Sequence, residues 1–348
     1  MKILIDIGHP AHVHFFKNAI WSWNNKGYEV KITARKKDVT IDLLDAYGFE
    51  YACLGMNRKG LVKKALGMAR NDYLLYKIAK EFRPDVLLGI HDPYIAQVGK
   101  LIGKPSIIFT DTEPVRFNWL VFPFASVICT PSCFRRNIGQ KQVRYEGYHE
   151  LAYLHPKYFK PDPTVLEDLG INSRFIVLRF ISWSAYHDVS LRGFHNESEI
   201  ELVKTLENYG HVFITSEKRL CKKLEKYKLK IPPEKIHSLL YYADLYIGEG
   251  GTMAVEAAVL GTPSIHIEAT SSGIATGELS GNFLELRNRY NLLYFYPDQN
   301  QALEKAISIL EDKNSKKKWR RKRKELLKDK INVTAWMTNF VEEYANSF

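Results

Sequence analysis

The chain has 348 residues, of which 45% are hydrophobic and 26% are charged, so it can bury a sizeable core and is neither disordered nor collagen-like. No stretch reaches the roughly 18 consecutive apolar residues of a membrane-spanning helix. The longest apolar stretch, 117–129, is interrupted by Asn118, Pro123 and Ser126. The first residues lack the pattern of a signal peptide, and we expect a cytoplasmic location.

The net charge of +11 is concentrated near the end of the sequence. The segment Lys313 to Lys330 holds eleven Lys and Arg against Glu325 and Asp329, so the other residues carry only about +2 of that net charge. This distribution argues against a broad nucleic-acid-binding groove. We expect the segment to hold the protein on an anionic membrane surface, as a peripheral protein of the inner face. A solvated helix face is the structural alternative.

Strand-like and helix-like segments alternate along the chain. Short β-branched runs separated by longer helical patterns are typical of parallel sheets covered by helices, so the predicted fold class is α/β. In the first half we predict helices at about 14–26 and 61–82, and strands at 2–7, 29–33, 85–89, 106–109 and 127–130. In the second half we predict strands at 175–180, 212–215, 245–247 and 264–267, with helices between them.

The alternation occurs twice, which predicts two Rossmann-like domains. Prolines break any long element between 150 and 163, so we place an N-terminal acceptor domain at 1–150 and a C-terminal nucleotide-sugar domain at 163–330. The segment 331–348 is predicted to hold a helix, at about 334–344, that packs back toward the first domain. A central cleft, faced by the carboxyl ends of both sheets, is the expected ligand site.

The most informative local pattern lies at 243–263. It reads as a buried strand, a glycine turn and a small-residue helix followed by Gly-Thr-Pro. Gly250 and Gly251 let a ligand approach the backbone, and the free N–H groups of a helix that starts near Thr252 suit a diphosphate. Glu256 lies one turn further along the same helix face, where it can accept hydrogen bonds from a ribose diol. A helix that starts at glycines and binds nothing is the structural alternative.

This segment resembles the donor-binding segment of GT-B nucleotide-sugar enzymes, especially the lipid-linked N-acetylglucosaminyltransferase of peptidoglycan synthesis and the UDP-N-acetylglucosamine 2-epimerases. The resemblance implies that Gly250, Gly251 and Thr252 bind the diphosphate and that Glu256 binds the ribose hydroxyls. It also implies a GT-B-like fold, a UDP-linked sugar as ligand, and no metal or other cofactor.

Over its full length the chain resembles an uncharacterised prokaryotic family, domain of unknown function 354. The likeness is carried by His9-Pro10-Ala11-His12-Val13 and by Ile181-Ser182-Trp183-Ser184-Ala185-Tyr186-His187-Asp188. Membership implies the GT-B fold but no particular reaction, because one fold hosts many chemistries.

Three histidines, His9, His12 and His14, follow the first predicted strand. Their spacing is irregular and no Cys or carboxylate lies close by in sequence, so we expect no metal site. His12 occupies the place of the His-Val pair in the transferase, which implies that it hydrogen-bonds the acceptor or acts as a base. For His9 and His14 we expect local turn and helix packing.

Carboxylates follow two further strands of the first domain. Asp92 comes after 85–89, and Asp111 and Glu113 come after 106–109. In the epimerases an Asp and a Glu at comparable strand ends perform acid/base chemistry, so the resemblance implies catalytic roles for Asp92 and for Asp111 or Glu113. The structural alternative is that Asp92 caps the next helix and Asp111 caps a turn.

Two loops of the second domain complete the predicted site. After 175–180, Trp183 can stack on the nucleotide base, Ser182 can bind the diphosphate, and His187 resembles the catalytic histidine of the epimerases; an aromatic residue here also suits a core. After 264–267, Glu268 is expected to contact the sugar hydroxyls, with an ordinary surface loop as the alternative. Further candidates in that loop are Thr276, Gly277, Glu278 and Asn282.

These features predict a metal-independent glycosyltransferase that moves a sugar from a UDP-sugar to a lipid-linked or surface-polysaccharide acceptor of the cell envelope. The first alternative is an enzyme similar to UDP-GlcNAc 2-epimerase, hydrolysing or not, that uses Asp92, Glu113 and His187. The second is a peripheral protein that binds a nucleotide-sugar without turnover. No nucleic-acid partner is expected, because no aromatic platform or recognition motif accompanies the basic segment.

Overall fold

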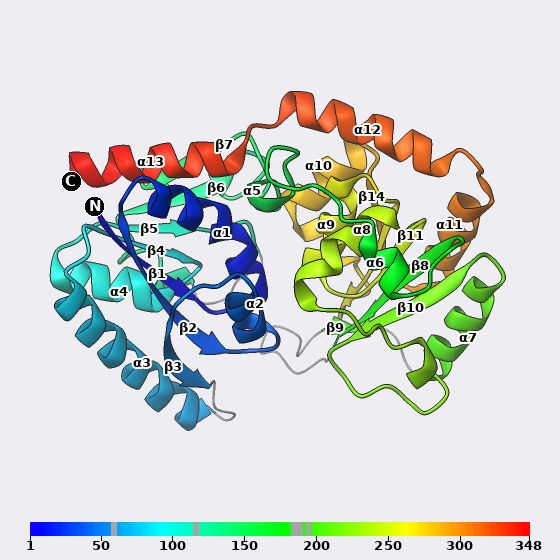
Figure 1. Cartoon of the computed structure of the whole chain (residues 1–348), viewed down its shortest axis with the longest axis horizontal. Coiled ribbons are helices and arrows are strands. Elements are labelled where there is room, and N and C mark those ends of the chain that lie inside the picture. Colours follow the sequence, from blue (N-terminus) through cyan, green and yellow to red (C-terminus); the bar gives the residue numbers. More distant parts are fainter. Residues whose placement is uncertain (57–60, 114–117, 182–190, 193–195) are drawn as a thin grey trace. The chain divides into compact units, whose positions relative to one another are not determined.

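The computed structural model describes residues 1–56, 61–113, 118–181, 191–192 and 196–348, and these fall into two compact units. Unit 1 comprises Met1–His155 and Ile331–Phe348, and unit 2 comprises Pro156–Lys330. Each unit is built around a parallel sheet covered by helices (Figure 1). The predicted α/β fold class is therefore confirmed.

Within the described residues, the sheet of unit 1 has seven parallel strands in the order β3-β2-β1-β4-β5-β6-β7. The strands are β1 (Lys2–Ile7), β2 (Glu29–Lys36), β3 (Ala52–Met56), β4 (Val86–Ile90), β5 (Ser106–Phe109), β6 (Val127–Pro131) and β7 (Gln142–Tyr145). Because all the strands run in one direction, the loops that follow β1, β4 and β5 meet at the same edge of the sheet.

Helices cover both faces of this sheet. They are α1 (Pro10–Asn25), α2 (Thr40–Ala46), α3 (Leu61–Phe82), α4 (Pro93–Ile102), the 3-10 turn η1 (Asn118–Leu120), α5 (Leu151–Leu154) and α13 (Val333–Ser347). The connections from β1 to β2 and from β3 to β4 cross the sheet in opposite directions, so right-handed crossovers place α1 and α3 on opposite faces. The core under α3 and α4 holds Leu4, Leu75, Leu87 and Ile95, all of them buried.

The C-terminal helix α13 packs on α1 and α5 in unit 1. The hydroxyl of Thr334 donates to the carbonyl oxygen of Ala152 (2.6 Å), which also accepts a hydrogen bond from the amide of Asn18 (2.8 Å). The ring of Trp336 lies 4.7 Å from that of Tyr145. The last helix is thus an integral part of the layer that covers one face of the first sheet.

In the described part of unit 2, five parallel strands form a sheet in the order β10-β8-β11-β12-β14. They are β8 (Phe175–Phe180), β10 (His211–Ser216), β11 (Leu245–Gly248), β12 (Ser264–Ile267) and β14 (Leu293–Tyr296). Two short strands, β9 (Leu191–Arg192) and β13 (Ala269–Thr270), pair antiparallel beside this sheet.

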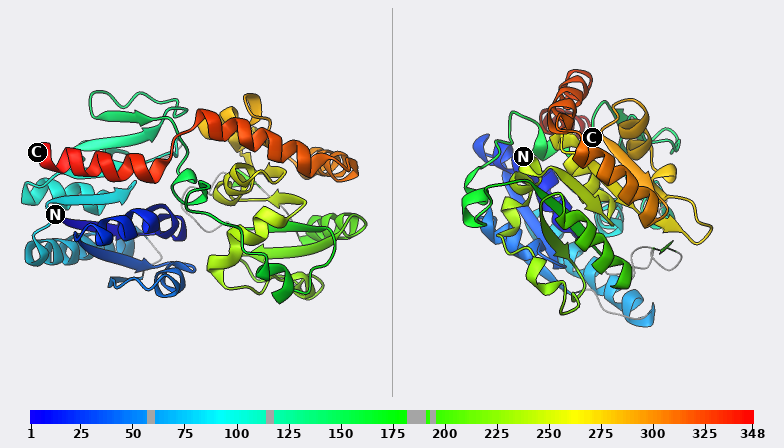
Figure 2. Two further views of the ribbon diagram at one scale, coloured as in Figure 1. Left: turned by 45° about the horizontal axis from the view of Figure 1, so that its top comes forward. Right: turned by 90° about the vertical axis from the view of Figure 1, so that its right-hand side faces the viewer.

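The helices of unit 2 are α6 (Thr164–Asp168), α7 (Asn196–Glu207), η3 (Glu225–Tyr227), η4 (Pro233–Lys235), α8 (Ile236–Tyr242), α9 (Gly251–Leu260), η5 (Thr276–Leu279), α10 (Gly281–Asn288), α11 (Gln299–Glu311) and α12 (Ser315–Asp329). Helix α9 packs against α8 and α12, and α11 packs against α7. Figure 2 shows α12, in orange, running along this unit.

Several predicted elements match the structure closely. The strands predicted at 2–7, 106–109, 175–180 and 264–267 are confirmed with those bounds, whereas the first helix begins at Pro10 and not near residue 14. The prediction missed β3, β7 and β14. Each is short, and β7 is only partly buried, so its hydrophobic pattern is weak.

Most cations of the basic segment are engaged within unit 2. Arg320 donates to the carbonyl oxygens of Leu260 (2.6 Å) and Tyr241, and Arg323 donates to that of Val259 (2.9 Å). These carbonyls end α9 and α8, where the helix dipole is negative, so the guanidinium groups complete both helices. Burial lowers the pKa of Arg320 to about 10.

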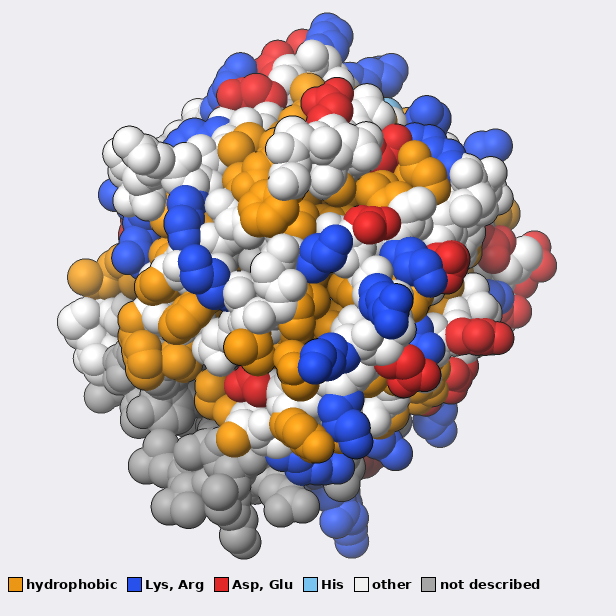
Figure 3. Space-filling model, turned by 90° about the vertical axis from the view of Figure 1, so that its left-hand side faces the viewer, with side chains coloured by type: hydrophobic (Ala, Val, Ile, Leu, Met, Phe, Trp, Pro, Cys, Tyr) orange, Lys and Arg blue, Asp and Glu red, His pale blue; other side chains and the backbone are white. Residues whose placement is uncertain are grey.

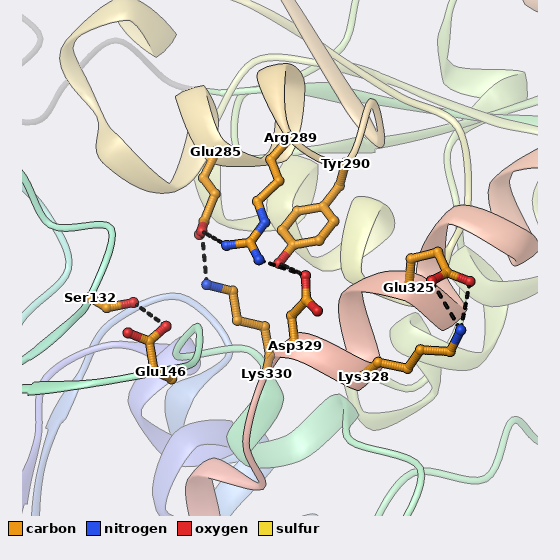
Figure 4. Close-up of polar contacts among 9 residues, drawn as sticks. All are labelled: Ser132, Glu146, Glu285, Arg289, Tyr290, Glu325, Lys328, Asp329 and Lys330. Carbon is orange, nitrogen blue, oxygen red and sulfur yellow. Dashed lines mark hydrogen bonds and ion pairs between the residues drawn. The ribbon is translucent and has the colours of Figure 1, made fainter.

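The end of α12 is also held by ion pairs (Figure 4). The buried ammonium of Lys330 lies 2.9 Å from the carboxylate of Glu285 on α10, and Asp329 accepts hydrogen bonds from Arg289 (2.8 Å) and Tyr290 (2.9 Å). A solvated helix face therefore does not describe most of this segment, because its cations cap carbonyl groups or form ion pairs within unit 2. Four cations of the segment have no hydrogen-bond or ion-pair partner among the described residues: Lys313, Lys317, Arg321 and Lys324.

An exposed apolar groove lies on unit 1. It has a volume of about 580 Å³ and is lined mainly by α4 and the segment around η1, with Leu101 and Trp119 exposed at 69% and 64%. Figure 3 shows hydrophobic side chains interspersed with Lys and Arg on one end of the molecule. Within the described chain, no helix is both long and apolar enough to cross a membrane.

Replacing Arg320 tests the structural role of α12. Arg320→Gln should lower the free energy of unfolding by about 1–2 kcal/mol, because two carbonyls lose a charged donor and Tyr241 loses the cation 3.5 Å from its ring centroid. Lys317→Gln, an exposed change on the same helix, should leave stability within about 0.5 kcal/mol. Chemical denaturation measures both, and equal effects would contradict a capping role for Arg320.

Candidate functional site

The turn between β11 and α9 is fixed by close backbone packing. A Cβ atom at Gly248 would lie 2.6 Å from the carbonyl oxygen of Arg179, so β11 and β8 approach at a distance that only glycine permits. The buried carboxylate of Glu249 accepts a hydrogen bond from the backbone N–H of Ile181 (2.9 Å), and the N–H of Glu249 donates to the Arg179 carbonyl (3.0 Å). The ends of two neighbouring strands are thereby tied together.

The N-terminus of α9 follows directly. Gly250, with φ +84°, is the N-cap residue, and no side chain of the described residues caps the helix. Thr252 lies at the second position of the helix and is exposed. The first N–H groups of a helix have no intrahelical acceptor and carry partial positive charge, so this N-terminus suits an anion.

Glu256 lies one turn further along α9 and is buried. Its Oε1 lies 3.0 Å from Nε2 of His237 on α8, and the His237 ring packs edge-on against Phe159. The histidine therefore orients the carboxylate that the sequence assigned to a ribose.

Glu268 follows β12 and belongs to a small polar cluster. Its Oε2 accepts a hydrogen bond from the hydroxyl of Thr276 (2.6 Å) and lies 3.1 Å from Nε2 of the buried His266. Glu278 pairs with Arg287 (2.6 Å), and the Asn282 side-chain oxygen accepts from the Phe283 N–H (2.9 Å).

Three predicted site residues of unit 2, Ser182, Trp183 and His187, lie outside the described residues. Gly277, a further candidate, is in η5, where a Cβ atom would lie 2.4 Å from the Phe295 ring. Packing against Phe295 therefore explains why this position is a glycine.

In unit 1 a buried arginine joins the ends of three strands. The guanidinium of Arg35, on β2, lies 2.5 Å from Asp6 on β1 and 3.0 Å from Asp92, which follows β4. Burial raises the pKa of Asp6, and the two carboxylates raise the pKa of Arg35 against the opposite effect of its own burial. Gly8 has no side chain because its Cβ would lie 2.3 Å from the guanidinium.

Asp92 has a second contact, which is structural. Its Oδ1 accepts a hydrogen bond from the N–H of Ile95 (3.0 Å) and caps α4, as the structural alternative supposed. The side chain is fully buried. Asp92 thus anchors α4 and Arg35 at the carboxyl edge of the sheet.

His12 lies in the first turn of α1, after β1. Burial lowers its pKa, and the charges of His9, Arg35 and Lys37 lower it further, so its neutral form prevails near pH 7. Nδ1 accepts a long hydrogen bond from the N–H of Gly8 (3.4 Å). With Nδ1 as acceptor, the neutral ring carries its proton on Nε2 and acts as a donor there.

Asp111, after β5, lies close to a histidine that the sequence analysis did not select. Its Oδ2 is 3.5 Å from Nδ1 of His149, and its Oδ1 accepts from the hydroxyl of Thr112 (3.2 Å). Burial lowers the pKa of His91, at the end of β4, and Asp92 and Asp111 oppose that shift. The edge of this sheet therefore gathers several histidines with perturbed pKa values, as functional sites often do.

Glu113 has a different place. It is 6% exposed, its Oε1 accepts a hydrogen bond from the backbone N–H of Arg135 (3.1 Å), and its carbonyl accepts one from Arg136 (3.1 Å). These contacts connect the loop after β5 with the segment after β6.

The predicted residues thus collect in two groups. Unit 1 brings the region of His12, Asp92 and Asp111 to one edge of its sheet, and unit 2 brings Gly250, Thr252 and Glu256 together on α9. The partners that hold them were not predicted from the sequence: Arg35, His149, His237, His266 and Glu249. Among the described residues, no group of three or more His, Cys, Asp or Glu side chains is arranged to hold a metal ion.

Comparison with protein families decides the relationship. Residues 1–339 match the family described as protein of unknown function (DUF354). The chain belongs to the DUF354 family. The chain is also similar to the uncharacterized protein MJ0665 of Methanocaldococcus jannaschii. The two are 27% identical over 281 residues, which cover 76% of this chain and 81% of that protein.

Solved structures share the fold of this DUF354 member at low identity. UDP-GlcNAc 2-epimerase from Neisseria meningitidis, bound to UDP-GlcNAc, matches with a TM-score of 0.64 and 12% identity over 100% of both chains. S. aureus MnaA, in a co-structure with UDP, matches with a TM-score of 0.69 and 11% identity over 100% of this chain and 97% of that one. The Streptomyces sp. SF2575 glycosyltransferase SsfS6 matches with a TM-score of 0.60 and 13% identity over 98% and 99%. The expected GT-B-like fold is confirmed.

Asp72 on α3 allows the electrostatics of unit 1 to be tested. Burial, and to a smaller extent Asp92, raises the pKa of Asp72 to about 6, so its ionisation destabilises the folded state as the pH rises from about 4 to about 6. Asp72→Asn should raise the free energy of unfolding by about 1 kcal/mol at pH 7.5, with allowance for partial exposure, and by almost nothing below about pH 4.

Urea denaturation across this pH range measures the effect, with Glu81→Gln as a control for an exposed acid on the same helix. A gain in stability that is the same at all pH values would contradict the assignment of the raised pKa to Asp72.

Proposed function

We propose that the protein is a glycosyltransferase that moves a sugar from a UDP-sugar to a hydroxyl of a lipid-linked or surface-polysaccharide acceptor. The observation that carries this proposal is the N-terminus of α9, which begins at a glycine with positive φ and has no capping side chain among the described residues. The fold is shared with proteins whose structures contain UDP or UDP-GlcNAc, which supports the same ligand class here.

In this proposal the backbone N–H groups of Gly251 and Thr252 bind the diphosphate, and Glu256, oriented by His237, binds the ribose. When the bond between sugar and diphosphate breaks, negative charge develops on the leaving UDP. The positive end of the α9 dipole would stabilise that charge without a metal ion, in a preorganised site. Glu268 is proposed to contact the sugar hydroxyls.

Unit 1 is proposed to bind the acceptor. His12 can donate a hydrogen bond from Nε2 to an acceptor oxygen, since Nδ1 already accepts one from Gly8. The carboxylate of Asp111 is 21% exposed, whereas those of Asp92 and Glu113 are buried and already bind backbone N–H groups. These contacts favour a supporting role for Asp92 and Glu113.

A UDP-sugar 2-epimerase is the second candidate, supported by the similarity to the Neisseria epimerase. Incubation with UDP-GlcNAc alone separates the two. A sugar whose configuration at C2 is inverted, whether still linked to UDP or released, would favour this candidate, whereas saturable binding with the configuration at C2 retained would favour the transferase.

Thr252 offers a direct test of the diphosphate site. Thr252→Glu puts an acid near the start of α9, where it should leave helix stability unchanged or slightly higher, by about 0.3–1 kcal/mol. The same charge should repel a diphosphate and weaken UDP binding at least tenfold. Thr252→Gln, similar in size but neutral, should bind UDP within about threefold of the natural protein.

Calorimetric titration with UDP, and with uridine as a ligand that lacks the phosphates, measures these effects. The affinity for uridine should change little in Thr252→Glu. If UDP binds equally well to the Glu and Gln variants, the diphosphate does not lie at the N-terminus of α9.

We further propose that the exposed cations of the basic segment hold the protein on an anionic membrane surface. Only Lys313, Lys317, Arg321 and Lys324 are counted here, at about 1 kcal/mol of attraction for each cation near the surface. Replacing all four by Gln should abolish sedimentation with vesicles containing phosphatidylglycerol. Persistent binding that is lost with Trp119→Ser would assign the contact to the apolar groove of unit 1 instead.

A further inference from the structure

His149 and Asp111 form an oriented pair at the carboxyl edge of the first sheet. His149 follows β7 and Asp111 follows β5, with Nδ1 of the histidine 3.5 Å from Oδ2 of the aspartate. The imidazole is 8% exposed and packs between two aromatic rings. The Phe15 ring centroid lies 4.6 Å away, and the Tyr145 ring is nearly parallel at 6.3 Å. These contacts limit the rotation of the imidazole, and the ion pair places Nδ1 toward Asp111.

The two ring nitrogens of His149 have different surroundings. Nδ1 faces the Asp111 carboxylate, which favours a proton on that nitrogen. Nε2 is buried and has no hydrogen-bond partner among the described residues. A buried polar atom without a partner is costly, and a ligand hydroxyl would satisfy it. With Nδ1 protonated, the lone pair of Nε2 is available to accept a proton.

The electrostatic environment of His149 is consistent with proton acceptance by its Nε2. Burial lowers the pKa of His149 and Asp111 opposes the shift, so the ring is neutral near pH 7 yet gains a stabilising carboxylate once protonated. The other titratable groups around it are His12 on α1, Tyr145 on β7 and the adjacent Glu150. His12 has the opposite tautomer, because its Nδ1 accepts a hydrogen bond and its proton lies on Nε2.

We propose that His149 is the general base of the transfer reaction and that Asp111 is its positioning residue. This inference rests on the proposed glycosyltransferase function. In the step, the O–H bond of the acceptor breaks and its proton moves to Nε2 of His149. The oxygen forms a bond to C1 of the sugar, while the bond between C1 and the diphosphate oxygen breaks and its electron pair leaves with UDP. The imidazolium then returns the proton to water.

The test uses UDP-GlcNAc with water as the acceptor, and measures UDP release and UDP-GlcNAc affinity in the same variants. His149→Asn places an amide where Nδ1 lies and so keeps a donor toward Asp111 while removing the base. It should lower kcat by about 10²–10⁴-fold and leave the Kd for UDP-GlcNAc within twofold. His211→Gln, which changes the exposed histidine at the start of β10, is the matched control and should leave both unchanged.

Asp111→Asn tests the positioning role. Loss of the carboxylate charge should lower the pKa of His149, so the acid limb of the kcat/KM profile should move to lower pH. Nitrogen-15 NMR of labelled His149 reads the tautomer and its titration without any turnover. We expect a proton on Nδ1 in the natural protein and a lower pKa in Asp111→Asn.

The outcomes separate the two proposals. A natural protein that binds neither UDP nor UDP-GlcNAc contradicts the proposed function. Normal binding together with full turnover in His149→Asn contradicts only the role of His149. A proton on Nε2 instead of Nδ1, or a titration of His149 that Asp111→Asn does not change, overturns the inference even if the substrate of the enzyme is another nucleotide-sugar.

Discussion

A buried charged side chain fixes the strand-end loops in each of the two sheets, and the candidate sites depend on it. In unit 1, Arg35 joins Asp6 and Asp92, so the ends of β1, β2 and β4 are held at one edge. In unit 2, the carboxylate of Glu249 binds the backbone after β8. Buried charges are tolerated only when they are paired or hydrogen-bonded, so these contacts resist loosening. Within each unit, these contacts hold the strand ends that carry the candidate site.

The basic segment shows how charge counted along a sequence differs from charge available to a partner. Its net charge suggested a surface for anionic lipids, yet Arg320 and Arg323 terminate α8 and α9, and Lys330 is buried against Glu285. Cations at helix C-termini are favourable because carbonyl groups there lack intrahelical donors. A smaller set of exposed cations remains for any membrane contact.

The sequence was sufficient to predict the α/β class, most strands and the helix that starts at Gly250, because hydrophobic periodicity and glycine turns are local signals. It was not sufficient to predict the pairs Asp111–His149 and Glu256–His237. Such pairs join residues from separate elements, and only the packing of those elements brings them together. For Asp92 the sequence left two alternatives, a catalytic carboxylate or a helix cap. The structure shows the cap of α4 and a pair with Arg35, and the catalytic role stays a prediction.

The proposed function depends most on the binding of a nucleotide-sugar diphosphate at the N-terminus of α9. The most direct measurement is a titration of the ¹⁵N-labelled protein with UDP-GlcNAc, followed through backbone amide signals. We expect saturable shifts that are largest at Gly250, Gly251 and Thr252, because their N–H groups would donate to the phosphates. Saturation that leaves these three amides unmoved, or the absence of any saturable shift, would show that the diphosphate does not bind at this N-terminus.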